Sequence, residues 1–152
     1  MDKNNKIGLR VVFKGELFDE NMNLKSATYK HNTLMNGGYD FICNALGNSD
    51  RPAAMEYVAI GKGTTANSAS MTALVSQLAI VKGTYSHTNG TKFFTLKAVF
   101  APGTGTGTIN ELAVFNALSG GTMLDRIVIG TVTKAAGDTY NATFQFAFEE
   151  VE

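Results

Sequence analysis

The sequence is poor in the residues that disulfides, metal centres and catalytic thiols require. Its 152 residues include one cysteine, two histidines, two prolines and no tryptophan. A single cysteine excludes an internal disulfide and every metal motif built from several cysteines. Cys43 lies in the apolar run YDFICNAL, where we expect it to be a small buried core residue. His31 and His87 are isolated in the sequence, so we predict no metal site.

An excess of charge of either sign is also lacking. The chain has 13 basic and 13 acidic residues, a net charge of zero, and only 17% charged residues. Because no basic run could follow a phosphate backbone, we predict no nucleic-acid partner. Arg10 and Lys14 interrupt the N-terminal apolar run, so we expect neither a membrane span nor an export signal. The cysteine usage is typical of a protein made and folded in the cytoplasm.

Glycine and strand-forming residues are abundant. Sixteen glycines and ten phenylalanines occur with many threonines and asparagines, which is typical of strands joined by tight turns. Eight segments have the pattern of strands: 7–18, 24–32, 55–61, 78–88, 91–101, 109–116, 123–132 and 138–151. In the first, Ile7, Leu9, Val11, Phe13 and Leu17 share one face; in the last, Tyr140, Ala142, Phe144, Phe146 and Phe148 do so. The pair Asn89-Gly90 predicts a hairpin between the segments at 78–88 and 91–101.

One segment has helical rather than strand periodicity. Tyr39, Ile42, Cys43 and Leu46 are spaced like one face of a helix, and Gly47 is placed like its C-terminal stop. Since glycine destabilises a helix interior, we expect the helix to begin after Gly37-Gly38 and to cover residues 38–46.

These patterns predict one domain over residues 1–152. We expect a mainly β fold, a single antiparallel β-sandwich or barrel-like domain of seven to eight strands with one short helix. An N-terminal hairpin over residues 1–31 is a candidate attachment or oligomer contact, and residues 32–152 form the core of the sandwich.

The segment AIGKGTTANSASMTAL, residues 59–74, places Lys62 between two glycines and ahead of two threonines. A phosphate-binding loop requires GxxxxGK[ST], with the lysine followed directly by a hydroxyl residue and then a helix. No glycine precedes Gly61 by five residues, and Gly63 follows Lys62 where the hydroxyl is needed. We therefore predict a surface loop whose glycines adopt positive φ, and no nucleotide or other cofactor.

Charged residues within apolar strands are the remaining candidates for chemistry. Asp125 and Arg126 are adjacent, and because neighbours in a strand point to opposite faces, we expect separate surface or edge charges. We interpret Glu111 as a polar residue at the rim of a sheet; the alternative is a lone buried carboxylate. Neither interpretation provides the second acid or histidine that a catalytic set requires, so we predict no catalytic residues.

Several segments from residue 30 onward carry a resemblance when taken together. These are HNTLMNGGYDFICNAL, a strand ending in YVAIGKGTTANSASMTAL, and TINELAVFNALSGGTMLDRIVIGTVTKAAGDTYNATFQFAF. Their order and spacing resemble a family of small bacteriophage virion proteins, labelled as head-decoration or tail-fibre proteins, with IGxGTT and ExAxFNAxSGGTMLxR segments. The matching residues are Ile60, Gly61, Gly63 to Thr65, Glu111, Ala113, Phe115 to Ala117, Ser119 to Leu124, Arg126, Lys134, and Gly137 to Thr139.

The resemblance implies a non-enzymatic β-sandwich in a virion assembled in the host bacterial cytoplasm. Its partners would be the major capsid protein or tail proteins, and copies would associate as a homo-oligomer. Because the sequence contains no shaft repeat, we expect a capsid decoration protein on the head exterior. The alternative is a tail fibre or a tail-tip component that binds host glycans. A glycan hydrolase is a further alternative, which would require two carboxylates about 5–9.5 Å apart in a cleft.

Overall fold

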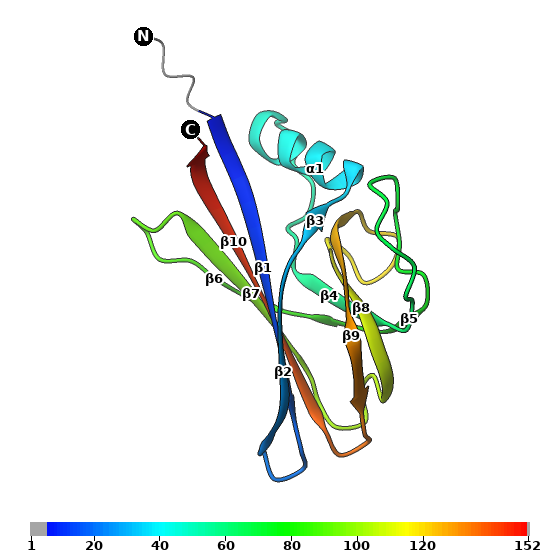
Figure 1. Ribbon diagram of the computed structural model, residues 1–152. Coiled ribbons are helices and arrows are strands. Elements are labelled where there is room, and N and C mark those ends of the chain that lie inside the picture. Colours follow the sequence, from blue (N-terminus) through cyan, green and yellow to red (C-terminus); the bar gives the residue numbers. More distant parts are fainter. Residues whose placement is uncertain (1–5, 152) are drawn as a thin grey trace.

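The computed structural model describes residues 6–151, which form two five-stranded sheets packed face to face with one helix across their end (Figure 1). Sheet A has the order β2 (Leu24–His31), β1 (Lys6–Phe18), β10 (Thr139–Val151), β7 (Phe93–Phe100) and β6 (Thr84–Ser86). Sheet B has the order β3 (Thr33–Leu34), β9 (Met123–Lys134), β8 (Gly107–Phe115), β4 (Tyr57–Gly61) and β5 (Gln77–Lys82). The expected antiparallel sandwich with one helix is confirmed. The described residues contain ten strands instead of the seven to eight expected, and two of the ten, β3 and β6, are very short.

The centre of sheet A is the pairing of the first and last strands of the chain. β1 and β10 are antiparallel over their whole length, from Lys6 opposite Val151 to Phe18 opposite Thr139. The alternation expected from the sequence is confirmed in their middle, where these side chains are buried: Val11, Phe13, Leu17, Tyr140, Ala142, Phe144 and Phe146. At the ends of the strands, Ile7 is 78% exposed and Phe148 is 42% exposed. Figure 1 shows why, since both strands continue past the end of sheet B.

Within the N-terminal hairpin, β1 is part of the core, whereas β2 is the edge strand of sheet A and has seven of its eight residues exposed. β2 pairs with β1 at the edge of sheet A, and two of its lysines contact more distant parts of the chain, β9 of sheet B and the turn between β9 and β10. Lys30 Nζ donates to the Val128 carbonyl at 2.7 Å, and Lys25 Nζ pairs with Asp138 Oδ2 at 2.9 Å. The hydrogen bond from Lys25, together with one from the Ala135 N–H, lowers the pKa of Asp138. A division of the chain at residue 31 does not correspond to a structural boundary, and the hairpin's role as an attachment contact stays a prediction.

The expected continuous strand over residues 78–88 is wrong, because the chain changes sheets at Gly83. β5 ends at Lys82 in sheet B, and β6 begins at Thr84 in sheet A. A Cβ atom on Gly83 would lie 2.8 Å from Leu96 Cδ1, so a larger residue would displace the buried Leu96 side chain where the backbone crosses against β7. The Gly83 N–H donates to the Glu56 carbonyl at 2.6 Å, which fixes the crossing. The turn at Asn89-Gly90 then joins β6 to β7, with Gly90 at φ +93°.

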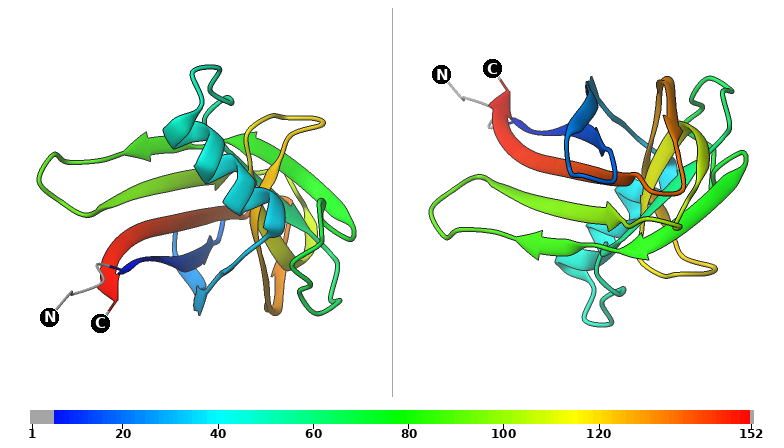
Figure 2. Two further views of the ribbon diagram at one scale, coloured as in Figure 1. Left: turned by 90° about the horizontal axis from the view of Figure 1, so that it is seen from above. Right: turned by 90° about the horizontal axis from the view of Figure 1, so that it is seen from below.

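The helix α1 (Asn36–Gly47) lies across the end of the sandwich (Figure 2). It starts before the two glycines, contrary to the expectation from glycine's poor helix propensity. Gly38 is buried, and a Cβ atom there would collide with the backbone carbonyl of Leu124, so glycine permits the close approach of α1 to β9. This contact also sets the rotation of the helix.

The apolar face of α1 differs from the predicted one. Gly38 is buried, and Phe41, Ile42 and Ala45 are half-buried on the inner side. Tyr39 and Leu46 are 59% and 79% exposed, and Cys43 is exposed instead of buried in the core. Among residues 6–151, no helix has the length and apolar character needed to cross a membrane.

The aromatic side chains of sheet A provide a test of the core. Phe144 is fully buried, and its ring centroid lies 5.2 Å from that of Phe13. We expect Phe144→Ala to lower the free energy of unfolding by about 3–5 kcal/mol, because truncation leaves a cavity between the sheets. Gln145→Ala, at the adjacent half-buried position, is the matched control and should cost less than about 1 kcal/mol. Equal losses in urea unfolding would contradict the assignment of the two faces.

Candidate functional site

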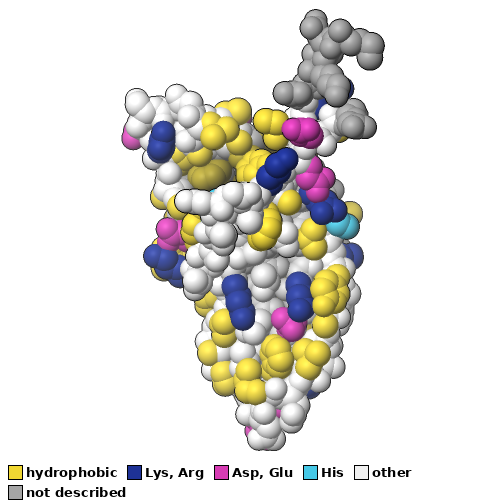
Figure 3. All heavy atoms as spheres, turned by 90° about the vertical axis from the view of Figure 1, so that its left-hand side faces the viewer, with side chains coloured by type: hydrophobic (Ala, Val, Ile, Leu, Met, Phe, Trp, Pro, Cys, Tyr) yellow, Lys and Arg dark blue, Asp and Glu magenta, His cyan; other side chains and the backbone are white. Residues whose placement is uncertain are grey.

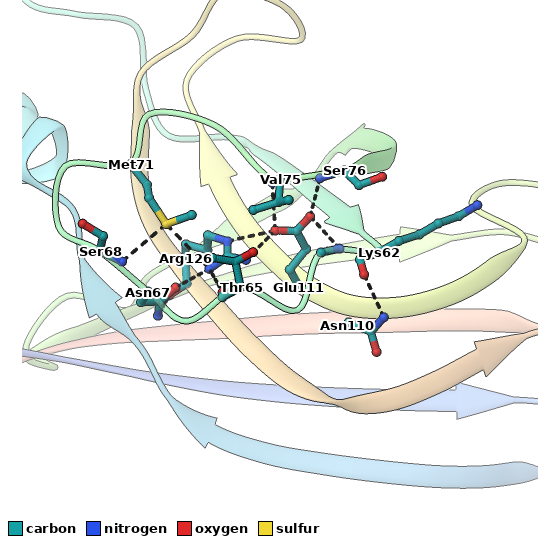
Figure 4. A network of polar contacts seen from close by, with 11 residues as sticks. Lys62, Thr65, Asn67, Ser68, Met71, Val75, Ser76, Asn110, Glu111 and Arg126 are labelled. Carbon is teal, nitrogen blue, oxygen red and sulfur yellow. Dashed lines mark hydrogen bonds and ion pairs between the residues drawn. The ribbon is translucent and has the colours of Figure 1, made fainter.

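The most elaborate polar structure in the molecule is a buried ion pair between two neighbouring strands of sheet B (Figure 4). Arg126 Nε donates to Glu111 Oε2 at 2.8 Å, and Arg126 Nη2 lies 2.8 Å from the same oxygen. Both side chains have zero exposure. Arg126 lies opposite Ala113 in the pairing of β8 with β9, so Glu111 is two residues along β8 and on the same face.

Glu111 also binds both ends of the long loop between β4 and β5. The N–H groups of Gly63 and Ser76 donate to Oε1 at 3.0 and 2.8 Å, and the Val75 N–H donates to Oε2 at 3.1 Å. One carboxylate therefore accepts three backbone hydrogen bonds in addition to that from Arg126. Residues 63 and 75–76, which are separated by the whole loop, are held at the same side chain.

Arg126 binds the middle of the same loop. Its Nη1 donates to the Thr65 carbonyl at 2.9 Å and to Asn67 Oδ1 at 2.8 Å. Asn67 Nδ2 in turn donates to the Arg126 carbonyl at 2.8 Å, and the Met71 sulfur lies 3.7 Å from Nη1. The guanidinium thus fixes loop backbone that belongs to neither sheet.

The environment keeps Glu111 ionised. Burial by itself would raise the pKa of this carboxyl, but the hydrogen bonds from Ser76, Val75, Arg126 and Gly63 outweigh burial and lower the pKa below its usual value. A carboxylate that accepts four hydrogen bonds and has zero exposure does not meet solvent as a general base would. The chemistry of this arrangement is structural: it converts a long loop into a fixed surface.

The glycines of the loop serve close approach rather than positive φ. A Cβ atom on Gly61 would lie 2.6 Å from Glu111 Oε1, and one on Gly63 would lie 2.6 Å from the same oxygen. Neither glycine has a positive φ, so the predicted reason for their presence is wrong. Both are buried between the strand end and the carboxylate.

Lys62 lies between these glycines with its side chain exposed and directed away from the ion pair (Figure 4). Its backbone is fixed on both sides: the Lys62 N–H donates to the Ser76 carbonyl at 2.8 Å, and Asn110 Nδ2 donates to the Lys62 carbonyl at 2.9 Å. In a phosphate-binding loop, successive backbone N–H groups face the anion. Here the Lys62 and Gly63 N–H groups donate to protein oxygens instead.

The expectations for the other charged residues of sheet B are wrong in their placement. Glu111 is not at a rim, and Asp125 and Arg126 are not surface or edge charges, because all three have zero exposure. Asp125 and Arg126 do have separate partners. Asp125 Oδ2 accepts from Asn32 Nδ2 at 2.6 Å, and Oδ1 accepts from the Val114 N–H at 3.1 Å.

Asp125 differs from Glu111 because no cation among residues 6–151 forms an ion pair with it. Burial raises the pKa of Asp125 to about 6, although the hydrogen bonds from Asn32 and Val114 act in the opposite direction. The side-chain oxygen of Asn32 is buried without a hydrogen-bond partner. A protonated Asp125 could donate to that oxygen after rotation of the amide, and the 2.6 Å separation of the two side chains is typical of an O–H···O bond.

The remaining sequence candidates lie apart from this network. His31 is at the exposed end of β2, and His87 contacts the Phe93 carbonyl at 2.7 Å through Nδ1 in the turn between β6 and β7. Within residues 6–151, no group of three or more His, Cys, Asp and Glu side chains is arranged to hold a metal ion.

The second candidate site is an apolar groove of about 370 Å³ between α1 and the projecting end of sheet A. It is lined by Leu9, Phe41, Ile42, Ala45, Leu46, Arg51, Pro52, Ala54, Met55, Tyr85, Phe94, Leu124, Phe146 and Phe148. Figure 3 shows hydrophobic side chains gathered around its opening near the top of the view. No sequence pattern indicates this groove, because it depends on how far β1 and β10 extend past the helix.

Comparisons of the chain with models of protein families, with curated proteins and with solved structures give no match.

The ion pair predicts a large effect of a minimal substitution. Glu111→Gln keeps the shape of the side chain, but its NH₂ group must face N–H donors in either orientation of the amide. We expect the free energy of unfolding to fall by about 3–5 kcal/mol, because the arginine remains buried without its counter-ion. Hydrogen exchange at the Gly63, Val75 and Ser76 amides should accelerate together. Glu16→Gln removes a partly exposed partner of Lys14 at 3.5 Å and should cost less than about 1 kcal/mol. Unchanged exchange in the Glu111 variant would contradict the loop-fixing role.

Asp125 predicts a pH dependence of stability. Its pKa is about 6 in the folded chain against an ordinary 3.8, so the folded state binds more protons than the unfolded state between these values. Its contribution to the free energy of unfolding therefore falls as the pH rises from about 4 to 6, by roughly 3 kcal/mol. Asp125→Asn does not titrate, and its amide can donate to the unpartnered Asn32 oxygen.

The measurement is urea unfolding of both proteins between pH 4 and 7. We expect the stability of the Asn variant relative to the parent to rise across this range. Other carboxyls, including Glu111 and Asp138, titrate in both proteins and cancel in the difference. Parallel pH profiles would show that Asp125 is not protonated in the folded chain.

Proposed function

We propose that this protein is a structural component of a bacteriophage virion, a decoration protein on the exterior of the capsid. The observation that carries the proposal is the convergence of the residues that resemble the phage family. Gly61, Gly63 and Thr65 of the IGxGTT segment contact Glu111 and Arg126 of the ExAxFNAxSGGTMLxR segment. Segments about 50 residues apart in the chain thus meet in one buried network.

This convergence supports a structural rather than a catalytic role for the residues that carry the resemblance. The acid and the base of the matching segments are both fully buried, and their polar atoms bind loop backbone. Such a network maintains the conformation of the loop when another protein binds to the loop's surface. The loop between β4 and β5, whose residues 64–70 are exposed, is the surface so maintained.

The shape of the described residues supports decoration over a fibre. Residues 6–151 form one sandwich, with Lys6 and Val151 paired at one end of sheet A (Figure 1). A fibre subunit carries a shaft of coiled coil or strand repeats that separates its tip from the particle. The described residues contain neither. The partner in this proposal is the major capsid protein, and the location is the virion.

The test is fractionation of phage particles into heads and tails, with quantification of this chain by mass spectrometry against the major capsid and tail-tube proteins. We expect the chain to accompany heads in a fixed ratio to the major capsid protein, because a decoration protein occupies a repeated lattice. A few copies that accompany tails would overturn decoration and favour the tail-fibre or glycan-binding alternative. Absence from purified particles would overturn the virion assignment.

A further inference from the structure

Asparagine is followed directly by glycine at two places in the chain, Asn36-Gly37 and Asn89-Gly90. In this dipeptide the glycine nitrogen attacks the carbonyl carbon of the preceding side chain with little hindrance, because glycine has no Cβ atom to obstruct the approach. The first pair begins α1, and the second forms the turn between β6 and β7. The fold therefore places the same dipeptide in two different environments.

Asn89-Gly90 lies at the exposed tip of the loop between β6 and β7. The Thr91 N–H and hydroxyl donate to the Thr88 carbonyl at 3.1 and 2.6 Å, so Asn89 and Gly90 are the two central residues of a turn. Among the described residues, the hydrogen bonds of this turn involve neither the Asn89 side chain nor the Gly90 N–H. The two groups that react therefore give up no hydrogen bond within the protein, and an exposed loop permits the rotation that brings them together.

Asn36-Gly37 lies in the first turn of α1, which is held on two sides. The Asn36 N–H donates to the Ala69 carbonyl at 2.8 Å, and the Gly38 N–H donates to the Met35 carbonyl at 2.9 Å. A Cβ atom on Gly38 would collide with the Leu124 carbonyl, so the helix backbone lies directly against β9. Ring closure turns the glycine nitrogen onto the same side as the asparagine Cβ atom, and this rotation would pull the start of the helix away from the loop and from β9.

We propose that Asn89 is a site of spontaneous modification, at which the folded protein converts asparagine to aspartate and isoaspartate, while the fold protects Asn36. The Gly90 nitrogen forms a bond to Asn89 Cγ and loses its proton, the Cγ–Nδ2 bond breaks, and Nδ2 leaves as ammonia. The product is a five-membered succinimide ring. Water then opens the ring: cleavage of the bond to Cγ gives aspartate, and cleavage of the bond to the backbone carbonyl carbon gives isoaspartate, in which the main chain runs through Cβ and Cγ.

The modification changes the charge and the backbone at one edge of sheet A. Each event replaces a neutral amide by a carboxylate, so the formal net charge of the chain changes from zero to one negative charge. Isoaspartate also adds one carbon to the main chain inside the turn that the Thr91 N–H and the Thr88 carbonyl close. Because β6 has only three residues and is paired with β7 alone, we expect it to loosen in the isoaspartate form.

The test is to age the purified protein for several weeks in mildly alkaline buffer at physiological temperature and to analyse its peptides by mass spectrometry. The peptide that contains Asn89 should gain the mass difference between an amide and an acid. Ageing in ¹⁸O-labelled water should add the heavy isotope to this peptide, because water opens the ring. A protein isoaspartyl methyltransferase should label the same peptide, and Asn89→Gln, which keeps an amide but requires a larger ring, should abolish the label.

Asn36 is the matched internal control, because it belongs to the same dipeptide. In the folded protein we expect Asn36 to react at least about tenfold more slowly than Asn89, since its reaction requires the helix start to open. Ageing in urea that unfolds the chain should remove most of this difference. The modified protein is separated by anion exchange, and hydrogen exchange should be faster at the amides of β6 but unchanged in the middle of β1 and β10.

An unmodified Asn89 in the folded protein would overturn the proposal, as would equal rates at Asn36 and Asn89 before unfolding. A mass gain without ¹⁸O would contradict the succinimide route. Unchanged exchange in β6 of the isoaspartate form would contradict the loosening of the sheet edge. These outcomes are independent of the particle fractionation, since the reaction requires only the folded chain and water.

Discussion

The structure depends on the requirement that a buried charge has a partner. Arg126 and Glu111 have zero exposure, and either one alone would carry an uncompensated charge into the interior. Their mutual contact neutralises the charges, but each side chain still has polar atoms that need hydrogen bonds. Gly63, Val75 and Ser76 donate to the carboxylate, and Thr65 and Asn67 accept from guanidinium Nη1. The other terminal nitrogen, Nη2, has the ion-pair contact with Glu111 Oε2 and no hydrogen-bond partner. The conformation of the loop between β4 and β5 is therefore a consequence of burying the pair.

The burial of this ion pair also explains the presence of glycines that secondary-structure propensity alone does not explain. Gly61 and Gly63 are present because a side chain at either position would occupy the place of the Glu111 carboxylate. Gly38 and Gly83 permit close contacts elsewhere: a Cβ atom on Gly38 would collide with the Leu124 carbonyl, and one on Gly83 would press on the Leu96 side chain. Only some glycines of this sequence, such as Gly90 and Gly120, serve turns with positive φ. In this sequence, glycine thus indicates closely packed backbone as well as loops.

The sequence predicts the parts of the fold in which periodicity and burial agree. The middle of β1 and β10 alternates as expected, and the hairpin at Asn89-Gly90 is where its turn residues place it. Alternation does not show where a strand leaves one sheet for the other, because Leu78 to Tyr85 has the same pattern whether or not the chain crosses at Gly83. Helical spacing likewise gives the existence of α1 but not its rotation, which depends on the contact between Gly38 and Leu124.

The ion pair was within reach of sequence reasoning. A charged residue in TINELAVF and another in MLDRIVIG interrupt consecutive strands joined by a short turn, and a two-residue offset in that hairpin places them on one face. Glu111, Asp125 and Arg126 lie in strands that are otherwise apolar along their length, as expected for strands buried on both faces, and this pattern argues against rim or surface positions for the three charges. Loop partners such as Asn67 could not be found in this way, because their position depends on the path of a loop without periodicity.

Inside the molecule, the charged groups of the loop network, Glu111 and Arg126, neutralise each other. In this respect the interior differs from the end that carries α1. In the interior, the polar atoms of Glu111 and Arg126 bind the loop between β4 and β5. These contacts hold the surface of that loop in one conformation. At the α1 end, the opposite holds: Tyr39 and Leu46 expose apolar area, and Asp40 and Arg51 are without salt bridges within residues 6–151. The two regions therefore differ in kind: polar contacts fix a loop in one, and apolar side chains remain in contact with water in the other. Any contact that covers Tyr39 and Leu46 would lower the free energy by removing their apolar surface from water.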